Sequence, residues 1–139
     1  MIVRAHVILR RNGRITLTRR APGLPAGGRW QLPGGHVEEG ESVAAAARRE
    51  AREEVGVEVD DVRLVHVHNH RIATGATRLA LIFEATAWRG EPHNAEPGLC
   101  DAVGFYDPDG LPRPMVSYIA DSLAAHRRGE FYSSAGWPA

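Results

Sequence analysis

Alternating apolar and polar positions at the start of the chain predict a β-hairpin. From Val3 to Leu9, aliphatic or small residues alternate with arginine and histidine, as expected for a half-buried strand. Asn12-Gly13 is a favoured hairpin turn, and residues 15–20 return as the partner strand. A Gly- and Pro-rich loop follows over residues 21–29.

Helical patterns occur twice. Residues 42–55 begin with Ser42, a favourable N-cap, continue through an alanine-rich stretch and end before Gly56, which suits the position after a helix. A second helix is expected from Pro114 to about Arg127, where apolar residues recur at helical spacing. Further strands are expected at residues 62–70, 78–88 and 102–106, with a turn near residues 74–75 and a polar loop at 89–100.

This order of strands and helices predicts an α/β fold. A helix that follows the second arm of a hairpin, with more strands after it, favours an α/β sandwich with a mixed sheet. At 139 residues, without repeats or low-complexity segments, the chain is expected to form a single domain over residues 1–139.

Composition narrows the classes of function. The 17 basic and 17 acidic residues cancel, so no electrostatic footprint for long nucleic acid is present. No apolar run is long enough for a membrane span, and the start of the chain lacks the apolar segment of a signal peptide. The single cysteine, Cys100, excludes an internal disulfide and suits a reducing compartment. We therefore expect a cytoplasmic protein without a membrane partner.

The segment from Gly35 to Val57 carries the most specific signal. Glu41 follows Gly35 after five residues, and Arg49-Glu50 follows Glu41 after seven. A small apolar residue, Glu53-Glu54, Gly56 and an aliphatic residue complete the frame.

The chemistry of this segment points to a cation. Glu50 and Glu54 lie one helical turn apart, Glu53 flanks them, and all three border the apolar stripe formed by positions such as Ala51. Like charges at this spacing repel. Clustered carboxylates supply the oxygen ligands that Mg²⁺ or Mn²⁺ prefers. The competing interpretation is a surface helix stabilised by ion pairs such as that of Arg49 with Glu53.

With Leu32-Pro33-Gly34-Gly35 in front of it, this frame resembles the signature of Nudix hydrolases. Thr18-Arg19-Arg20, Trp30-Gln31 and the run from Trp88 to Glu96 are similar to MutT-type members, which are nucleoside triphosphate pyrophosphohydrolases. The resemblance implies the Nudix α/β/α sandwich. It also implies Mg²⁺- or Mn²⁺-dependent attack of water on the phosphorus of a nucleoside diphosphate derivative.

The resemblance also implies roles for individual residues. Glu50, Glu54 and the Gly35 carbonyl would bind metal, while Glu53 would either bind a further ion or deprotonate the attacking water. Arg49 and Glu41 would brace the loop against the helix. The remaining site residues implied are Glu96 as a further metal ligand or base, and Arg20, Leu32 and Gly34 as substrate contacts.

Residues outside the signature leave alternatives open. Glu96 and Arg20 could instead be solvated loop residues. His66, His68 and His70 share one strand face by their period-two spacing. They could hold zinc, line a pocket or subunit interface, or be ordinary, partly exposed histidines.

Three functions follow from these observations. The first is hydrolysis of a nucleoside di- or triphosphate, with a triphosphate yielding the monophosphate and pyrophosphate. The second keeps the chemistry and changes the substrate to ADP-ribose, a nucleotide sugar or a dinucleoside polyphosphate. The third is a non-catalytic nucleotide sensor, which the intact signature disfavours.

Substrate choice and assembly are expected to be as follows. The positions comparable to the base-reading residues of MutT hold Leu32 and Met115, whose side chains lack an amide. We therefore expect a broad pocket with a modest preference for an oxidised base. The aromatic residues of segment 129–139 could cover the interface of a homodimer.

Overall fold

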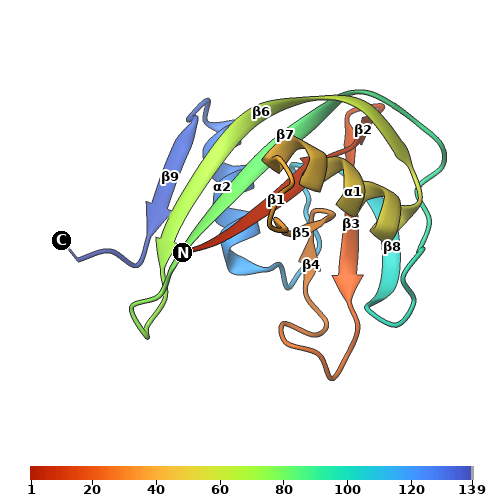
Figure 1. The fold of residues 1–139 in the computed structure, drawn as a ribbon. Coiled ribbons are helices and arrows are strands. Elements are labelled where there is room, and N and C mark those ends of the chain that lie inside the picture. The colour runs from red at the N-terminus through yellow and green to blue at the C-terminus, as the bar shows by residue number, and fades with distance from the viewer. Residues whose placement is uncertain (139) are drawn as a thin grey trace.

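A mixed β-sheet forms the centre of the computed structural model, which describes residues 1–138 (Figure 1). The strand order is β5-β1-β7-β6-β9; β1 runs parallel to β7, β6 runs parallel to β9, and the other neighbours are antiparallel. The strands are β1 (Ile2–Ile8), β5 (Gly34–His36), β6 (Glu58–Arg71), β7 (Thr77–Arg89) and β9 (Tyr132–Ala135).

A smaller sheet and two helices complete the fold. In the smaller sheet, β3 is central and pairs with β2, β4 and β8. The helices pack on opposite faces of the large sheet, which confirms the predicted α/β/α sandwich (Figure 1). These elements are β2 (Arg10–Arg11), β3 (Arg14–Arg20), β4 (Trp30–Gln31), β8 (Cys100–Tyr106), α1 (Val43–Val55) and α2 (Ser117–Arg127).

Strand β1 is buried on both faces, which corrects the expectation of a half-buried strand. Val7 packs in the core beneath α1, whereas Ile8 packs in a second core with α2 and the smaller sheet. His6, expected on the polar side, is only 1% exposed. The cause is the second helical layer, because α2 covers the face that the alternating pattern assigned to solvent.

Helix α1 follows its sequence signals closely. The Ser42 side chain accepts a hydrogen bond from the backbone N–H of Ala45 at 3.0 Å, and Gly56 adopts a φ of 70° at the C-terminal end. The predicted stripe is confirmed, since Ala47, Ala51 and Val55 are completely buried. Small side chains on this stripe allow the helix to lie close to β1 and β5.

Helix α2 begins at Ser117, three residues later than predicted. The backbone before it is held by β4: Trp30 N–H donates to the Pro114 carbonyl at 2.9 Å, and Val116 N–H donates to the Trp30 carbonyl at 2.8 Å. These bonds keep the segment extended, so Met115 precedes the helix rather than forming its first turn. No helix within residues 1–138 has the length and apolarity to cross a bilayer.

Strand β9 was not predicted. Residues 132–135 pair with residues 67–70 of β6 and extend the large sheet by one strand. The segment has exposed aromatic side chains, and a short strand of small residues carries little periodic signal.

Serine 133 on β9 links two buried histidines of β6. His66 Nδ1 lies 2.9 Å from the Glu130 carbonyl oxygen, so this nitrogen carries a proton and donates it. In the neutral ring Nε2 is then an acceptor, and the Ser133 hydroxyl donates to it over 2.7 Å. The Ser133 oxygen in turn accepts from His68 Nδ1, also at 2.7 Å. Both rings are thus held with the proton on Nδ1.

This arrangement changes how the three histidines are interpreted. His66 and His68 are 0% and 1% exposed, so the reading as partly exposed residues is wrong for both. Nε2 of His66 is occupied by the Ser133 hydroxyl, and no three His, Cys, Asp or Glu side chains within residues 1–138 are grouped to hold a metal. His70 lies further along the strand, with its ring stacked on Tyr118 at 5.3 Å between ring centroids.

Replacing Ser133 by alanine should destabilise the fold. Loss of the hydroxyl leaves a buried acceptor on His66 and a buried donor on His68 without their partner, at a cost of about 1–3 kcal/mol in the free energy of unfolding. Ser134→Ala, at an exposed position on the same strand, is the matched control and should change stability by less than about 0.5 kcal/mol. Urea unfolding of both variants measures the difference, and equal midpoints would contradict the proposed link.

Candidate active site

Two adjacent glycines allow three elements to meet at the site. A Cβ on Gly34 would lie 2.3 Å from His6 Nδ1 and 2.4 Å from the Ala5 carbonyl oxygen. A Cβ on Gly35 would lie 2.9 Å from Glu50 Oε1. The backbone of β5 can therefore approach both β1 and the carboxylates of α1; at Gly34, where the near atoms include backbone, a Cβ would not fit.

Glu54 uses this close approach directly. Its Oε2 accepts a hydrogen bond from the backbone N–H of Gly34 at 2.5 Å, and the residue is only 6% exposed. Burial, followed by repulsion from Glu50, raises the pKa of the Glu54 carboxyl well above its ordinary value. Glu54 is thus a buried acidic group that forms no ion pair within residues 1–138.

Arg49 connects the loop before α1 to the helix itself. Its guanidinium donates twice to Glu41, at 2.7 and 3.1 Å, and once to the His36 carbonyl at 3.0 Å. The same group donates to Glu50 at 3.0 Å and to Glu53 at 3.1 Å. The hydrogen bond from Arg49 lowers the pKa of the Glu41 carboxyl. This geometry is that of a brace, and it also places a positive charge against two of the acidic residues.

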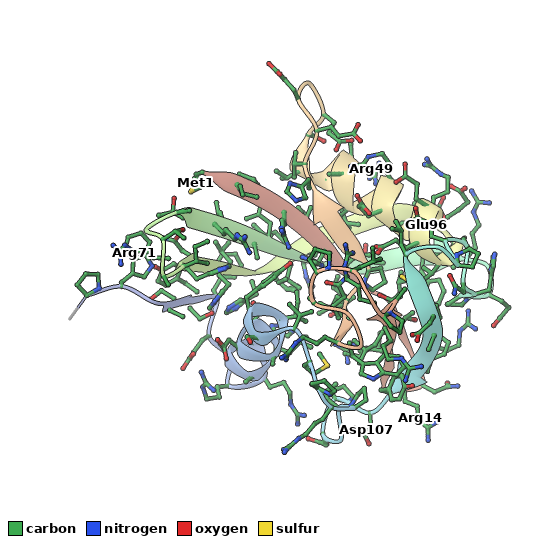
Figure 2. The ribbon with its side chains drawn as sticks, turned by 90° about the horizontal axis from the view of Figure 1, so that it is seen from below. Met1, Arg14, Arg49, Arg71, Glu96 and Asp107 are labelled. Carbon is green, nitrogen blue, oxygen red and sulfur yellow. The ribbon has the colours of Figure 1, made fainter. Side chains whose placement is uncertain are left out.

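The loop between β7 and β8 delivers Glu96 to α1. Backbone N–H groups of His93 and Ala95 donate to the carbonyls of Val55 and Glu54 at the end of α1, both at 3.0 Å. The Asn94 side chain accepts from the N–H of Glu96 at 3.1 Å and donates to the Cys100 carbonyl at 2.7 Å. Glu96 and Arg49 consequently lie on the same side of the molecule (Figure 2).

The four predicted acidic residues interact with one another electrostatically. Burial, and then repulsion from Glu53 and Glu96, raises the pKa of Glu50, although Arg49 opposes this shift. Burial and repulsion from Glu53 likewise raise the pKa of Glu96. Loop and helix have therefore been brought close enough to form one acidic centre, which includes Glu54.

The donor set of this centre fits a hard divalent cation. Its carboxylates and the nearby Gly35 backbone are all oxygen donors, the type that Mg²⁺ and Mn²⁺ prefer. In residues 1–138 no three His, Cys, Asp or Glu side chains yet converge tightly enough to enclose an ion. To bind an ion, the side chains of Glu50 and Glu53 would have to turn away from Arg49. This movement is feasible because each carboxylate would exchange the arginine for the metal ion as its positive partner.

A cavity of about 750 Å³ opens beside Gly34 and Gly35, on the α2 side of the large sheet. Its lining is strongly basic although the chain as a whole is neutral. Asp121 is the one acidic residue that lines it within the described part of the chain. The arginines that line the cavity are Arg4, Arg20, Arg29, Arg71 and Arg78.

The predicted substrate contacts divide into two groups. Arg20 and Gly34 line the cavity, as expected of residues that touch substrate. Leu32 does not line the cavity, because it is completely buried in the core between α2 and the smaller sheet. Met115 also packs against this core. Gln31, whose amide both donates and accepts hydrogen bonds, lines the cavity. The modest preference for an oxidised base stays a prediction.

Sequence reasoning missed most of the cavity floor. Arg4, Arg78 and the cavity-lining His68 occupy polar positions of alternating strands and were read as solvent-facing or left undecided. A signal was present, because arginine or histidine recurs at alternate positions of β1 and β6. Only the order of the strands in the sheet shows that these positions come together at one site.

Comparisons with known proteins agree with this geometry. Residues 1–126 match the NUDIX domain family. The crystal structure of a MutT NUDIX hydrolase from Burkholderia pseudomallei is 35% identical, with a TM-score of 0.80 over 88% of this chain and 95% of that chain. An 8-oxo-dGTP diphosphatase of Proteus vulgaris is 29% identical over 64% of this chain and 79% of its own length. The CTP pyrophosphohydrolase of Escherichia coli is 36% identical over 52% and 54%.

The fold, the acidic helix and the glycine loop together define a pyrophosphohydrolase. The chain belongs to the NUDIX domain family and resembles its MutT-like members. Nudix hydrolases act on small nucleotide substrates and generally use divalent metals, which matches the acidic centre and the basic cavity that it adjoins.

Glu54→Gln should stabilise the metal-free protein near neutral pH. Because the folded state raises the pKa of Glu54, this group stabilises the fold at low pH, and that stabilisation is lost as the pH rises through the folded-state pKa. Glutamine keeps an acceptor for the Gly34 N–H and carries no charge. In EDTA at pH 7.5 we expect the variant to melt a few degrees higher than the wild type, with the difference vanishing near about pH 4. A lower melting temperature at pH 7.5 would contradict the assigned electrostatics.

Proposed function

We propose that the chain is a Mg²⁺- or Mn²⁺-dependent hydrolase of nucleoside di- and triphosphates, which releases pyrophosphate and a monophosphate from a triphosphate. One observation carries this proposal: an acidic centre and an arginine-lined cavity adjoin the same glycine pair, Gly34 and Gly35. A polyphosphate needs both, because cations must neutralise its charge and the arginines must orient it.

The residues of the chain divide the work between binding and proton transfer. Glu50, Glu54 and the Gly35 carbonyl are proposed to hold the ion, which when bound polarises the phosphate and lowers the pKa of water. Arg20 and Arg29, in the part of the cavity formed by the loop after β3, are proposed to orient the phosphates. Their planar guanidinium groups suit bidentate contacts with phosphate oxygens.

Two carboxylates are candidates for accepting the proton of the attacking water. Glu53 has the more exposed side chain, at 47%, and can reach an incoming water once Arg49 releases it. Burial and repulsion from Glu53 raise the pKa of Glu96, which makes its carboxylate a better proton acceptor. The arrangement of Arg49 with Glu41 supports a positioning role for both, since they fix the helix that carries Glu50 and Glu53.

The substrate is proposed at the level of a nucleoside polyphosphate. The two named relatives act on different bases, an oxidised guanine in one case and cytosine in the other. We further propose that residues 1–139 act as one catalytic domain, because both sheets and both helices contribute to the site. A homodimer and a cytoplasmic location remain predictions.

Glu53→Gln and Glu54→Gln should each lower kcat/KM by about 10²- to 10⁴-fold, because each removes a charge from the proposed metal and proton-transfer centre. The assay is phosphate release in Mg²⁺, coupled to pyrophosphatase, over a panel of nucleoside triphosphates, ADP-ribose and a nucleotide sugar. Glu39→Gln, an exposed carboxylate of the preceding loop, is the control. Turnover near that of the wild type in both variants would refute the site. Cleavage of only ADP-ribose or the sugar would move the function to those substrates.

Glu96→Gln should reduce kcat far more than it raises KM. Its carboxylate lies with the acidic centre and away from the basic cavity, so it should act on metal or water rather than on the nucleoside. Steady-state kinetics with the best triphosphate separates the two parameters. A raised KM with unchanged kcat would place Glu96 in substrate binding instead.

A further inference from the structure

A second group of cations lies on the floor of the cavity and has no part in the chemistry above. Arg4 of β1 and Arg78 of β7 come from neighbouring parallel strands, and Arg4 pairs in register with Ala80, two residues beyond Arg78. Residues two apart on a strand share a face, so both guanidinium groups rise from the α2 side of the sheet. Ala80, the residue opposite Arg4, has only a methyl side chain. We call Arg4 and Arg78 the floor arginines.

The neighbours of the floor arginines add to the positive character. His36 on β5 lies directly opposite Arg4, and His70 on β6 lies directly opposite Arg78. Burial and the two guanidinium groups lower the pKa of both imidazoles. Like charges across neighbouring strands are destabilising, so this arrangement costs the fold stability. From α2, Asp121 and Tyr118 face the same space.

The floor arginines lack a counter-ion within the part of the chain that the structure describes. Several arginines elsewhere form ion pairs; for example, Arg10 pairs with Glu84 and Arg11 with Glu91. Arg4 donates only to the Tyr118 hydroxyl, at 3.2 Å, and no ion pair within residues 1–138 includes either floor arginine.

The floor arginines also hold unused hydrogen-bond donors. Nε of Arg4 and Nε of Arg78 are both buried and have no acceptor. Buried donors on a charged group are rarely left without a partner, because their desolvation is unfavourable. The structure therefore has a place for an anion that supplies both charge and acceptor oxygens.

We propose that the floor arginines bind a second anionic group of the substrate, a phosphate ester on its nucleoside, separate from the diphosphate that is hydrolysed. The proposal rests on the proposed function, since it assumes that the acidic centre and Arg20 hold the diphosphate. A base alone offers neutral acceptors, whereas a phosphate matches two guanidinium groups in both charge and geometry. The preferred substrates are thus nucleotides phosphorylated at the sugar as well as at the 5′ position.

Binding without turnover tests this inference. In EDTA, calorimetric titration compares adenosine 5′-monophosphate with adenosine 3′,5′-bisphosphate, and the corresponding guanosine pair. We expect each bisphosphate to bind at least about tenfold more tightly than its monophosphate, with the advantage falling as salt is added. Arg4→Gln and Arg78→Gln should each bring the ratio toward one. Arg14→Gln is the control. Arg14 is exposed, does not line the cavity and lies far from the cavity-lining Arg71, so this variant should leave the binding ratio unchanged (Figure 2).

Melting temperatures distinguish a ligand-binding role of the floor arginines from a structural one. Because the floor arginines repel their neighbours, ligand-free Arg78→Gln should melt at or above the wild-type temperature. A bisphosphate should raise the melting temperature of the wild type more than that of the variant. A clear loss of stability in the ligand-free variant, without any change in the binding ratio, would assign a structural role and overturn the inference.

The outcomes separate this inference from the proposed function. Hydrolysis of triphosphates together with equal binding of mono- and bisphosphates would leave the proposed function standing and refute the second anion site. A preference for guanosine over adenosine, without a gain from the added phosphate, would refute it as well and assign the floor arginines to base recognition. Tight bisphosphate binding without any triphosphate hydrolysis would support the anion site and refute the proposed function.

Discussion

The site depends on the absence of side chains at Gly34 and Gly35. Gly34 lies against the backbone of β1, where a Cβ would not fit, and Gly35 lies against a carboxylate of α1. Glu54 consequently reaches the Gly34 backbone, and Glu50 borders that of Gly35. The same glycine pair also lines the basic cavity, so both halves of the site share this short strand.

Charge is separated within the molecule although the total is zero. Acidic side chains collect where α1 meets the β7–β8 loop, and arginines line the cavity on the other face of the large sheet. Arg49 is the exception, since it sits among the acidic groups and donates to Glu41, Glu50 and Glu53. Its hydrogen bonds to Glu50 and Glu53 offset repulsion between these carboxylates, so the same residue is both a brace and a counter-ion.

Local signals made most of the fold predictable, and long-range pairing explains the rest. The caps of α1 and the turn at Asn12-Gly13 are encoded by adjacent residues, as is the spacing of the helix carboxylates. The predicted pairing of the first strand with residues 15–20 is wrong, because β3 pairs with the short β2 while β1 joins β5 and β7 in the large sheet. The start of α2 was misplaced because a distant residue, Trp30, holds the preceding backbone. The floor of the cavity was missed for a related reason: its residues come from strands whose neighbours are known only from the sheet order. Leu32 was assigned to substrate binding because motif position does not show which way a side chain points.

The unpredicted strand β9 also decides how the large sheet ends. Without it, β6 would present a long row of free backbone N–H and carbonyl groups, the kind of border that recruits strands from other molecules. Val67 N–H donates to the Phe131 carbonyl, and β9 continues this pairing with only four residues. The opposite border is formed by β5, which is shorter still. At residues 67–70 of β6 the border is thus formed by a strand too brief to template another chain, and this local protection against edge-to-edge aggregation is built into the same segment that fixes the buried histidines.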